Sequence, residues 1–207
     1  AVYYLRVDTV DYLLPFVESK ATLNPRLAEM LETRSSSLVT LYKSMSHDEK
    51  VVIFVRLFLL FIKYDLDSSS RPGVPLFYVN KYVQLMESHF IENVMVAELR
   101  GQFVDGVRSL LEALAKYGKV NLTGMSTAEV LRLLFDGRYE NENVLVREMS
   151  TMLDELKRQQ SSERPVSLQV CCRNVVRTSL ASLAETHIER LEIPVQLKLL
   201  IKDRPYV

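Results

Sequence analysis

The residues best suited to catalysis or metal binding in this sequence are its three histidines. His47, His89 and His187 lie far apart in the chain, and none belongs to a recognisable ligand motif. Glu185 and His187 lack the spacing that places two ligands on one helix face. The sequence also contains no glycine-rich phosphate loop and no nucleophile elbow. We therefore predict that the protein is not an enzyme and needs neither a metal nor a cofactor.

The cysteines offer little redox chemistry. Cys171 and Cys172 are the only two in the chain, and they are adjacent. Adjacent cysteines rarely bond to each other, and these lack the C-x-x-C spacing of a redox pair. We expect two reduced thiols packed in the protein interior. Reduced thiols also predict an intracellular protein, in the cytoplasm, the nucleus or both.

The composition gives no sign of a nucleic-acid or membrane partner. The 207 residues include 26 Lys and Arg and 26 Asp and Glu, so the formal net charge is zero. Ten tyrosines and eight phenylalanines could stack on bases, but they follow the spacing of helix cores. Apolar residues make up 48% of the chain and charged residues 25%, as in an ordinary globular protein.

One apolar segment, residues 51–62, could suggest a membrane span. It carries Arg56 in its middle and lies between Lys50 and Lys63. A spanning helix needs about 20 apolar residues, more than this segment offers. We predict instead a buried central helix from His47 to Lys63.

The elements that would position any site are predicted to be helices almost throughout, so the fold class is all-α. Asn24-Pro25 predicts the start of a helix, with an N-cap followed by proline at the first helical position. Ser46 and Ser126 each precede a glutamate by three residues, the capping-box spacing that begins a helix.

Apolar stripes at three- and four-residue steps predict further helices over residues 79–94, 102–117 and 141–160. Gly101 is expected to separate the first two. Only residues 2–7 suggest a short extended segment.

The clearest domain boundary lies in residues 159–165, which are polar and end in a proline. We predict an irregular helical domain over residues 1–160 and a smaller module over residues 161–207. Residues 107–122 look like the outer helix and turn of an ankyrin repeat, and residues 75–79 echo the start of one. The Thr-Pro-Leu-His motif is missing and no repeat of about 33 residues extends along the chain. A non-repeating helical bundle is therefore favoured over a degenerate ankyrin-like domain.

The C-terminal module carries the most informative pattern. A helix over residues 167–183 would place six apolar side chains on one stripe: Leu168, Cys172, Val175, Val176, Leu180 and Leu183. Arg173, Asn174 and Arg177 would occupy other faces. A helix this short is unstable alone, so the stripe needs a partner, either within the chain or in another protein.

These residues resemble the SOCS box. The family's elongin-binding pattern is a small or hydroxyl residue, Leu, three residues, Cys, three residues and an aliphatic residue, which Ser167, Leu168, Cys172 and Val176 match. Further on, residues 187–201 look like the family's second half, in which a Leu-Pro-x-Pro corner precedes a final amphipathic helix. The sequence keeps Leu191, Ile193 and Pro194 but has Glu192 where the first proline usually stands.

The resemblance covers about a fifth of the chain. It implies a three-helix module that binds elongin C and elongin B, and then a cullin with its RING protein, cullin-5 in preference to cullin-2. Ser167, Leu168, Cys172 and Val176 would contact elongin C. Leu191, Ile193 and Pro194 would form the cullin-facing corner, while Leu197, Leu200 and Ile201 would pack the module.

The protein would thus be a substrate receptor that brings an unidentified target protein to a ubiquitin ligase. Two alternatives stay open from the residues themselves. The first is a helical interaction scaffold whose C-terminal helices are core or bind another partner. The second is a catalytic site that forms only in three dimensions and has no signature along the chain.

Overall fold

The computed structural model of the chain confirms the all-α class. It describes residues 6–16, 46–64, 66, 76–92, 97–117, 119–135, 144–162, 168–180 and 185–202, and these contain nine α-helices, two short 3-10 helices and no strand. The α-helices are α1 (Val7–Leu13), α4 (His47–Lys63), α5 (Phe77–Glu92), α6 (Ala97–Lys116), α7 (Thr127–Phe135), α8 (Val144–Ser162), α9 (Leu168–Ser179), α10 (Glu185–Glu189) and α11 (Val195–Ile201). The 3-10 helices are η2 (Leu14–Phe16) and η3 (Leu122–Gly124).

Helix α4 begins at the predicted capping box. The Ser46 hydroxyl accepts a hydrogen bond from the Glu49 backbone N–H at 3.3 Å, and the Glu49 carboxylate accepts one from the Ser46 backbone N–H at 2.9 Å. Two backbone donors that the helix itself leaves unpaired are satisfied in this way. At the start of α7, the Ser126 hydroxyl likewise accepts from the Glu129 backbone N–H at 3.1 Å.

This capping box makes stability depend on pH in a defined direction. The backbone hydrogen bond from Ser46, together with that from its side chain, holds the pKa of Glu49 below its ordinary value of 4.5. Because the pKa of Glu49 is lowered in the folded state, the charged carboxylate stabilises the fold at pH values above the ordinary pKa of 4.5. That contribution disappears as the pH falls through the folded pKa.

We expect Ser46→Ala to lower the free energy of unfolding by about 1 kcal/mol near neutral pH. Glu49→Gln should destabilise the protein near neutral pH and lose its effect in acid, at a pH well below the lowered pKa of the folded state. Thermal unfolding at the two pH values checks both. A Glu49→Gln deficit that persists unchanged in acid would show that the carboxylate's charge is not what stabilises the helix start.

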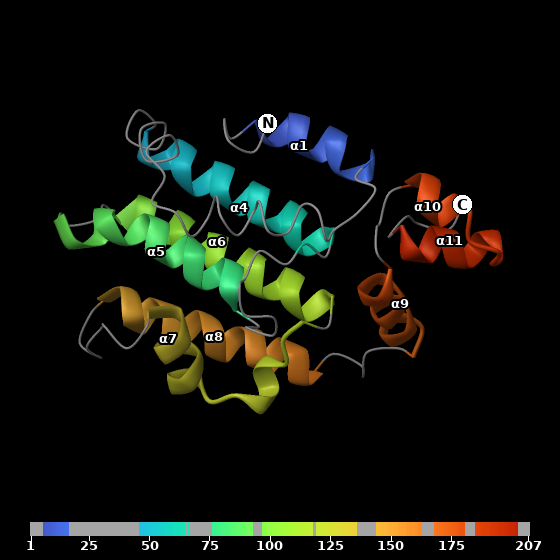
Figure 1. Ribbon diagram of the computed structural model, residues 1–207. Coiled ribbons are helices and arrows are strands. Elements are labelled where there is room, and N and C mark those ends of the chain that lie inside the picture. Colours follow the sequence, from blue (N-terminus) through green and yellow to red (C-terminus); the bar gives the residue numbers. More distant parts are fainter. Residues whose placement is uncertain are drawn as a thin grey trace.

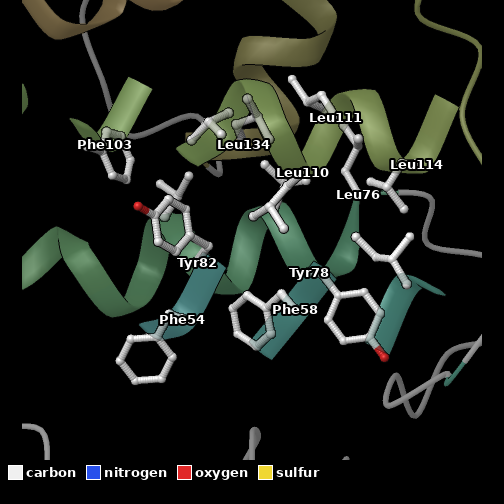
Figure 2. Packing of buried hydrophobic residues seen from close by; sticks show 14 of the residues in the cluster. Phe54, Phe58, Leu76, Tyr78, Tyr82, Phe103, Leu110, Leu111, Leu114 and Leu134 are labelled. Atoms are coloured by element: carbon white, nitrogen blue, oxygen red, sulfur yellow. The ribbon is translucent and has the colours of Figure 1, made fainter. Parts of the chain in front are cut away.

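The main core forms where the aromatic face of α4 meets α5 and α6. Phe54 and Phe58 are at most 2% exposed, and the Phe58 ring lies 5.6 Å from that of Tyr78 between centroids. Tyr82 of α5 stacks on Phe103 of α6, with centroids 5.2 Å apart and planes at 18°. Figure 2 shows these rings packed against the leucines of α6. The apolar run at residues 51–62 is therefore the centre of this core.

The helices of the N-terminal part lie side by side in a stack (Figure 1). Helix α1 packs on α4, α4 packs on α5 and α6, and α7 and α8 cover the opposite side. Arg100 donates from Nε to both carboxylate oxygens of Glu148 at 2.9 Å, and Arg108 pairs with Glu155 at 2.8 Å, so two ion pairs join α6 to α8. Helices α9, α10 and α11 gather at one end of the stack (Figure 1).

Three predicted boundaries are wrong. Gly101 lies inside α6 rather than between two helices, because the apolar stripe that follows it packs on α4 and outweighs the roughly 1 kcal/mol that glycine costs a helix. Helix α8 continues to Ser162, through the first part of the predicted linker. Helix α9 ends at Ser179 instead of running to residue 183, because Leu180 leaves the helix and packs against Ile188 and Ile201. The helix predicted at residues 24–32, and residues 2–5 of the extended segment, lie outside the described residues.

Candidate partner-binding module

A small apolar core forms between α10 and α11. Ile188 of α10 and Ile201 of α11 are 2% and 3% exposed. Three half-buried side chains pack against them: Leu180, Leu191 and Ile193. Tyr64, directly after α4, also packs against this cluster, so the module contacts the helical stack. The contact is extended by α10, which touches η2 at the end of α1.

Helix α9 contacts the stack through its charged side. Arg173 and Arg177 are only 6% and 5% exposed. Their guanidinium carbons lie 5.6 Å and 5.2 Å from the centre of the Tyr117 ring, a cation–π arrangement. Positions 173 and 177 are four apart and therefore share one helix face. That face, rather than the apolar one, is buried.

The same arginines bond to backbone carbonyls at helix ends. Arg177 donates to the carbonyl of Lys63, the last residue of α4, and to that of Ile201, the last residue of α11. Arg173 donates to the carbonyl of Lys116, the last residue of α6, in a long contact of 3.4 Å. A buried charge is tolerated when it is hydrogen-bonded. These carbonyls supply hydrogen-bond acceptors for both guanidinium groups.

The side of α9 away from the two arginines is exposed to solvent, with Val176 at its edge. We call Cys172, Val175 and Val176 the docking face: Cys172 is exposed, Val175 is 66% exposed and Val176 is 38% exposed. Single exposed apolar residues are common on proteins, but several together on one helix indicate a contact surface. Two positions of the SOCS-box-like pattern, Cys172 and Val176, therefore lie on an accessible face.

The prediction of buried thiols is wrong for both cysteines. Cys171 and Cys172 are both exposed at the surface. The physical reason is the orientation of α9: because the arginine face is turned inward, the positions across the helix are turned outward. The stripe predicted from the sequence is also divided, since Leu180 packs into the small core of the module while Val175 is exposed.

The remaining predicted site residues occupy different environments. Ser167 lies outside the described residues, and Leu168 is the first residue of α9, with a side chain outside the described part. Leu191 and Ile193 are half-buried against the module's core, and Pro194 is an exposed N-cap of α11.

Of the three residues expected to pack the module, only Ile201 is buried. Leu197 is 45% exposed, so its predicted packing role is wrong, and Leu200 is half-buried. Leu197 lies one turn before Ile201 on the same face of α11, but it is not among the side chains that pack against Ile188 and Ile201.

Two features are absent from the described part of the chain. Among the residues that the structure places, no three His, Cys, Asp or Glu side chains come together as a metal ion would require. No described helix is both long and apolar enough to cross a membrane. Comparison of the chain with protein-family models, with curated proteins and with solved structures finds no match.

Sequence reasoning missed the role of Arg173, Arg177 and Tyr117. The sequence pattern places Arg173 and Arg177 only on faces other than the apolar stripe, and charged residues on such faces are ordinarily solvated. The available signal was their four-residue spacing, which aligns two guanidinium groups on one side of a short helix. Their acceptors, the ends of three other helices, could not be located along the chain.

Proposed function

We propose that this protein is a substrate receptor of a cullin-RING ubiquitin ligase, with no catalytic chemistry of its own. The observation that carries the proposal is the outward position of Cys172 and Val176, two residues of the elongin-binding pattern that the sequence resembles. A helix that binds another protein must present its anchors to solvent before the partner arrives.

Elongin C, in complex with elongin B, is the proposed partner of α9. Leu168 would insert at the N-terminal end of the helix, next to Ser167, with Cys172 and Val176 one and two turns further on. The small thiol of Cys172 allows a partner helix to approach closely. A few apolar anchors that become buried together can dominate an interface of this kind.

The corner between α10 and α11 is the proposed cullin contact. Leu191 and Ile193 shape this corner from its inner side, while Pro194 and Val195 are exposed at its tip. Glu192 is also exposed, and it stands where the SOCS box usually has a proline. We propose cullin-5 in preference to cullin-2, together with its RING protein.

The ligase would act by proximity. The helical stack would hold a target protein while the C-terminal module joins the elongins and the cullin, so that a ubiquitin-charged enzyme comes within reach of the target's lysines. This activity belongs in the cytoplasm or the nucleus.

The scaffold alternative makes a different demand on α9. If the C-terminal helices were only core of one continuous domain, their apolar stripe would be covered by the chain itself. The 66% exposure of Val175 counts against that form of the scaffold. A scaffold that binds another partner through α9 would leave Val175 exposed as well, and binding of the elongins separates it from the receptor.

Co-expression of the full chain with elongins B and C tests the proposal. We expect a ternary complex that survives size-exclusion chromatography and that captures cullin-5 in a second step. A chain that elutes alone in the presence of excess elongin B–C complex would rule out the receptor function.

A further inference from the structure

The contact beneath α9 joins the ends of three helices. Lys63, Lys116 and Ile201 are the last residues of α4, α6 and α11. The final carbonyls of a helix have no donor within the helix, and they carry the negative end of its dipole. Arg173 and Arg177, both on α9, donate hydrogen bonds to these carbonyls. Their positive charges thereby offset the negative ends of three helix dipoles.

The choice of arginine at both positions has a physical reason. A guanidinium group is planar and has donors pointing in several directions, so Arg177 can bond to carbonyls of two helices at once. It also stacks on an aromatic ring, and the Tyr117 ring lies beneath both arginines. A lysine ammonium group is not planar, and its donors are not held in a fixed arrangement.

The site also gathers positive charge. Besides the two arginines, the Nζ atom of Lys116 lies 5.4 Å from the centre of the Tyr117 ring. Like charges repel, so this arrangement needs the helix ends and the electron-rich ring to hold it together. A contact with such demands on geometry favours one orientation of α9 over others.

We propose that Arg173 and Arg177 are positioning residues: with Tyr117 they form an arginine clasp that fixes the direction in which the docking face is presented relative to the helical stack. The inference rests on the proposed function, because a ubiquitin ligase receptor must hold its target and its elongin contact in a defined geometry. The clasp supplies that geometry without using any residue of the docking face.

The apolar stripe gives α9 a competing arrangement. Twelve residues form only a marginal helix in water, so α9 depends on its packing. Without the arginines, the helix would bury more apolar surface by rolling so that Val175 and Val176 face the stack. The clasp disfavours this roll because it would leave the arginines' acceptors without their donors.

A distance measurement between spin labels tests the clasp. The chain has only two cysteines, so Cys171→Ser leaves Cys172 as a single label site on the docking face. A second label enters at Ala128→Cys, an exposed position of α7 in the stack. Pulsed electron paramagnetic resonance then reports how α9 is oriented relative to the stack.

With both arginines present we expect one narrow distance distribution. In Arg173→Met/Arg177→Met it should be replaced by a broad or shifted one. The matched control is Arg158→Met, which removes an exposed arginine of α8 and should leave the distribution unchanged. A narrow, unshifted distribution in the double variant would overturn the inference, whatever happens to thermal stability.

A second variant covers the case in which the double variant does not fold. Arg177→Lys keeps the positive charge but loses the planar guanidinium group with its several donors. It should therefore also broaden the distance distribution. An unchanged distribution there would equally count against the clasp. The measurement uses the chain alone. If the native chain failed to bind elongins, the proposed function would be wrong. The measured distances would still show whether the clasp orients α9.

Discussion

Val176→Asp is expected to weaken binding of the elongin B–C complex by about 30-fold or more, the effect of losing an interface anchor worth about 2 kcal/mol. The proposed contact would bury this side chain in an apolar pocket, and an aspartate there must lose its hydration without gaining a partner. The free protein should fold normally, because Val176 is already 38% exposed and lies on the outward side of α9. Isothermal titration of the variant with purified elongin B–C complex measures the change.

A matched substitution separates loss of an anchor from a general effect of charge. Val52 of α4 is 52% exposed and lies in the helical stack, remote from α9 in the sequence. Val52→Asp should bind elongins as the native chain does. Native-like affinity of Val176→Asp would show that the docking face does not bind elongin C. Equal losses in both variants would show that the added charge, rather than the lost anchor, weakens binding.

Much of the helical stack could be predicted from local patterns. The Ser46 capping box predicted the start of α4, and the apolar run that follows it predicted a buried central helix. These signals are strong because hydrogen bonds at helix ends and apolar periodicity act over a few residues. The all-α class follows from them directly.

The orientation of α9 could not be predicted because its cause is not local. Nothing near Arg177 in the sequence indicates that α4 and α11 end beside it. The stripe was predicted as one continuous surface, whereas the structure divides it, and the buried face of α9 is set by distant carbonyls and by Tyr117. The exposure of its two thiols could therefore not be predicted from the apolar stripe.

The two glycines of α6 also differ in a way that depends on distant residues rather than on the local sequence. Local reasoning treats Gly101 and Gly106 alike, since glycine weakens the middle of any helix. The structure separates them. A Cβ at Gly101 would have nothing within 4 Å, whereas a Cβ at Gly106 would lie 2.6 Å from the Tyr82 hydroxyl oxygen and 2.7 Å from a Val55 methyl carbon. Among the glycines that the structure describes, Gly106 is therefore the one with the closest neighbours, which come from α4 and α5.

Gly106→Ala is therefore expected to destabilise the protein even though alanine is the better helix former. The gain in helix propensity is about 1 kcal/mol. Tyr82 cannot move aside freely, because its ring is fully buried and stacks on Phe103. Overpacking in a well-packed core typically costs about 1–3 kcal/mol, and two contacts below 3 Å place this site at the upper end of that range. We expect a net loss of about 1–2 kcal/mol, or a fall of roughly 2–8 °C in the unfolding midpoint.

Gly101→Ala, in the same helix, supplies the control and should have the opposite sign. With open space around the new methyl group, only the helix propensity and the reduced freedom of the unfolded chain remain, so we expect a gain of about 0.5–1 kcal/mol. Denaturant unfolding of both variants measures the difference. Equal stabilisation by the two substitutions would mean that α6 does not approach Tyr82 and Val55 as closely as described. The packing of α4, α5 and α6 around Gly106 would then have to be revised, because the position of α6 between these helices leaves no room for a side chain there.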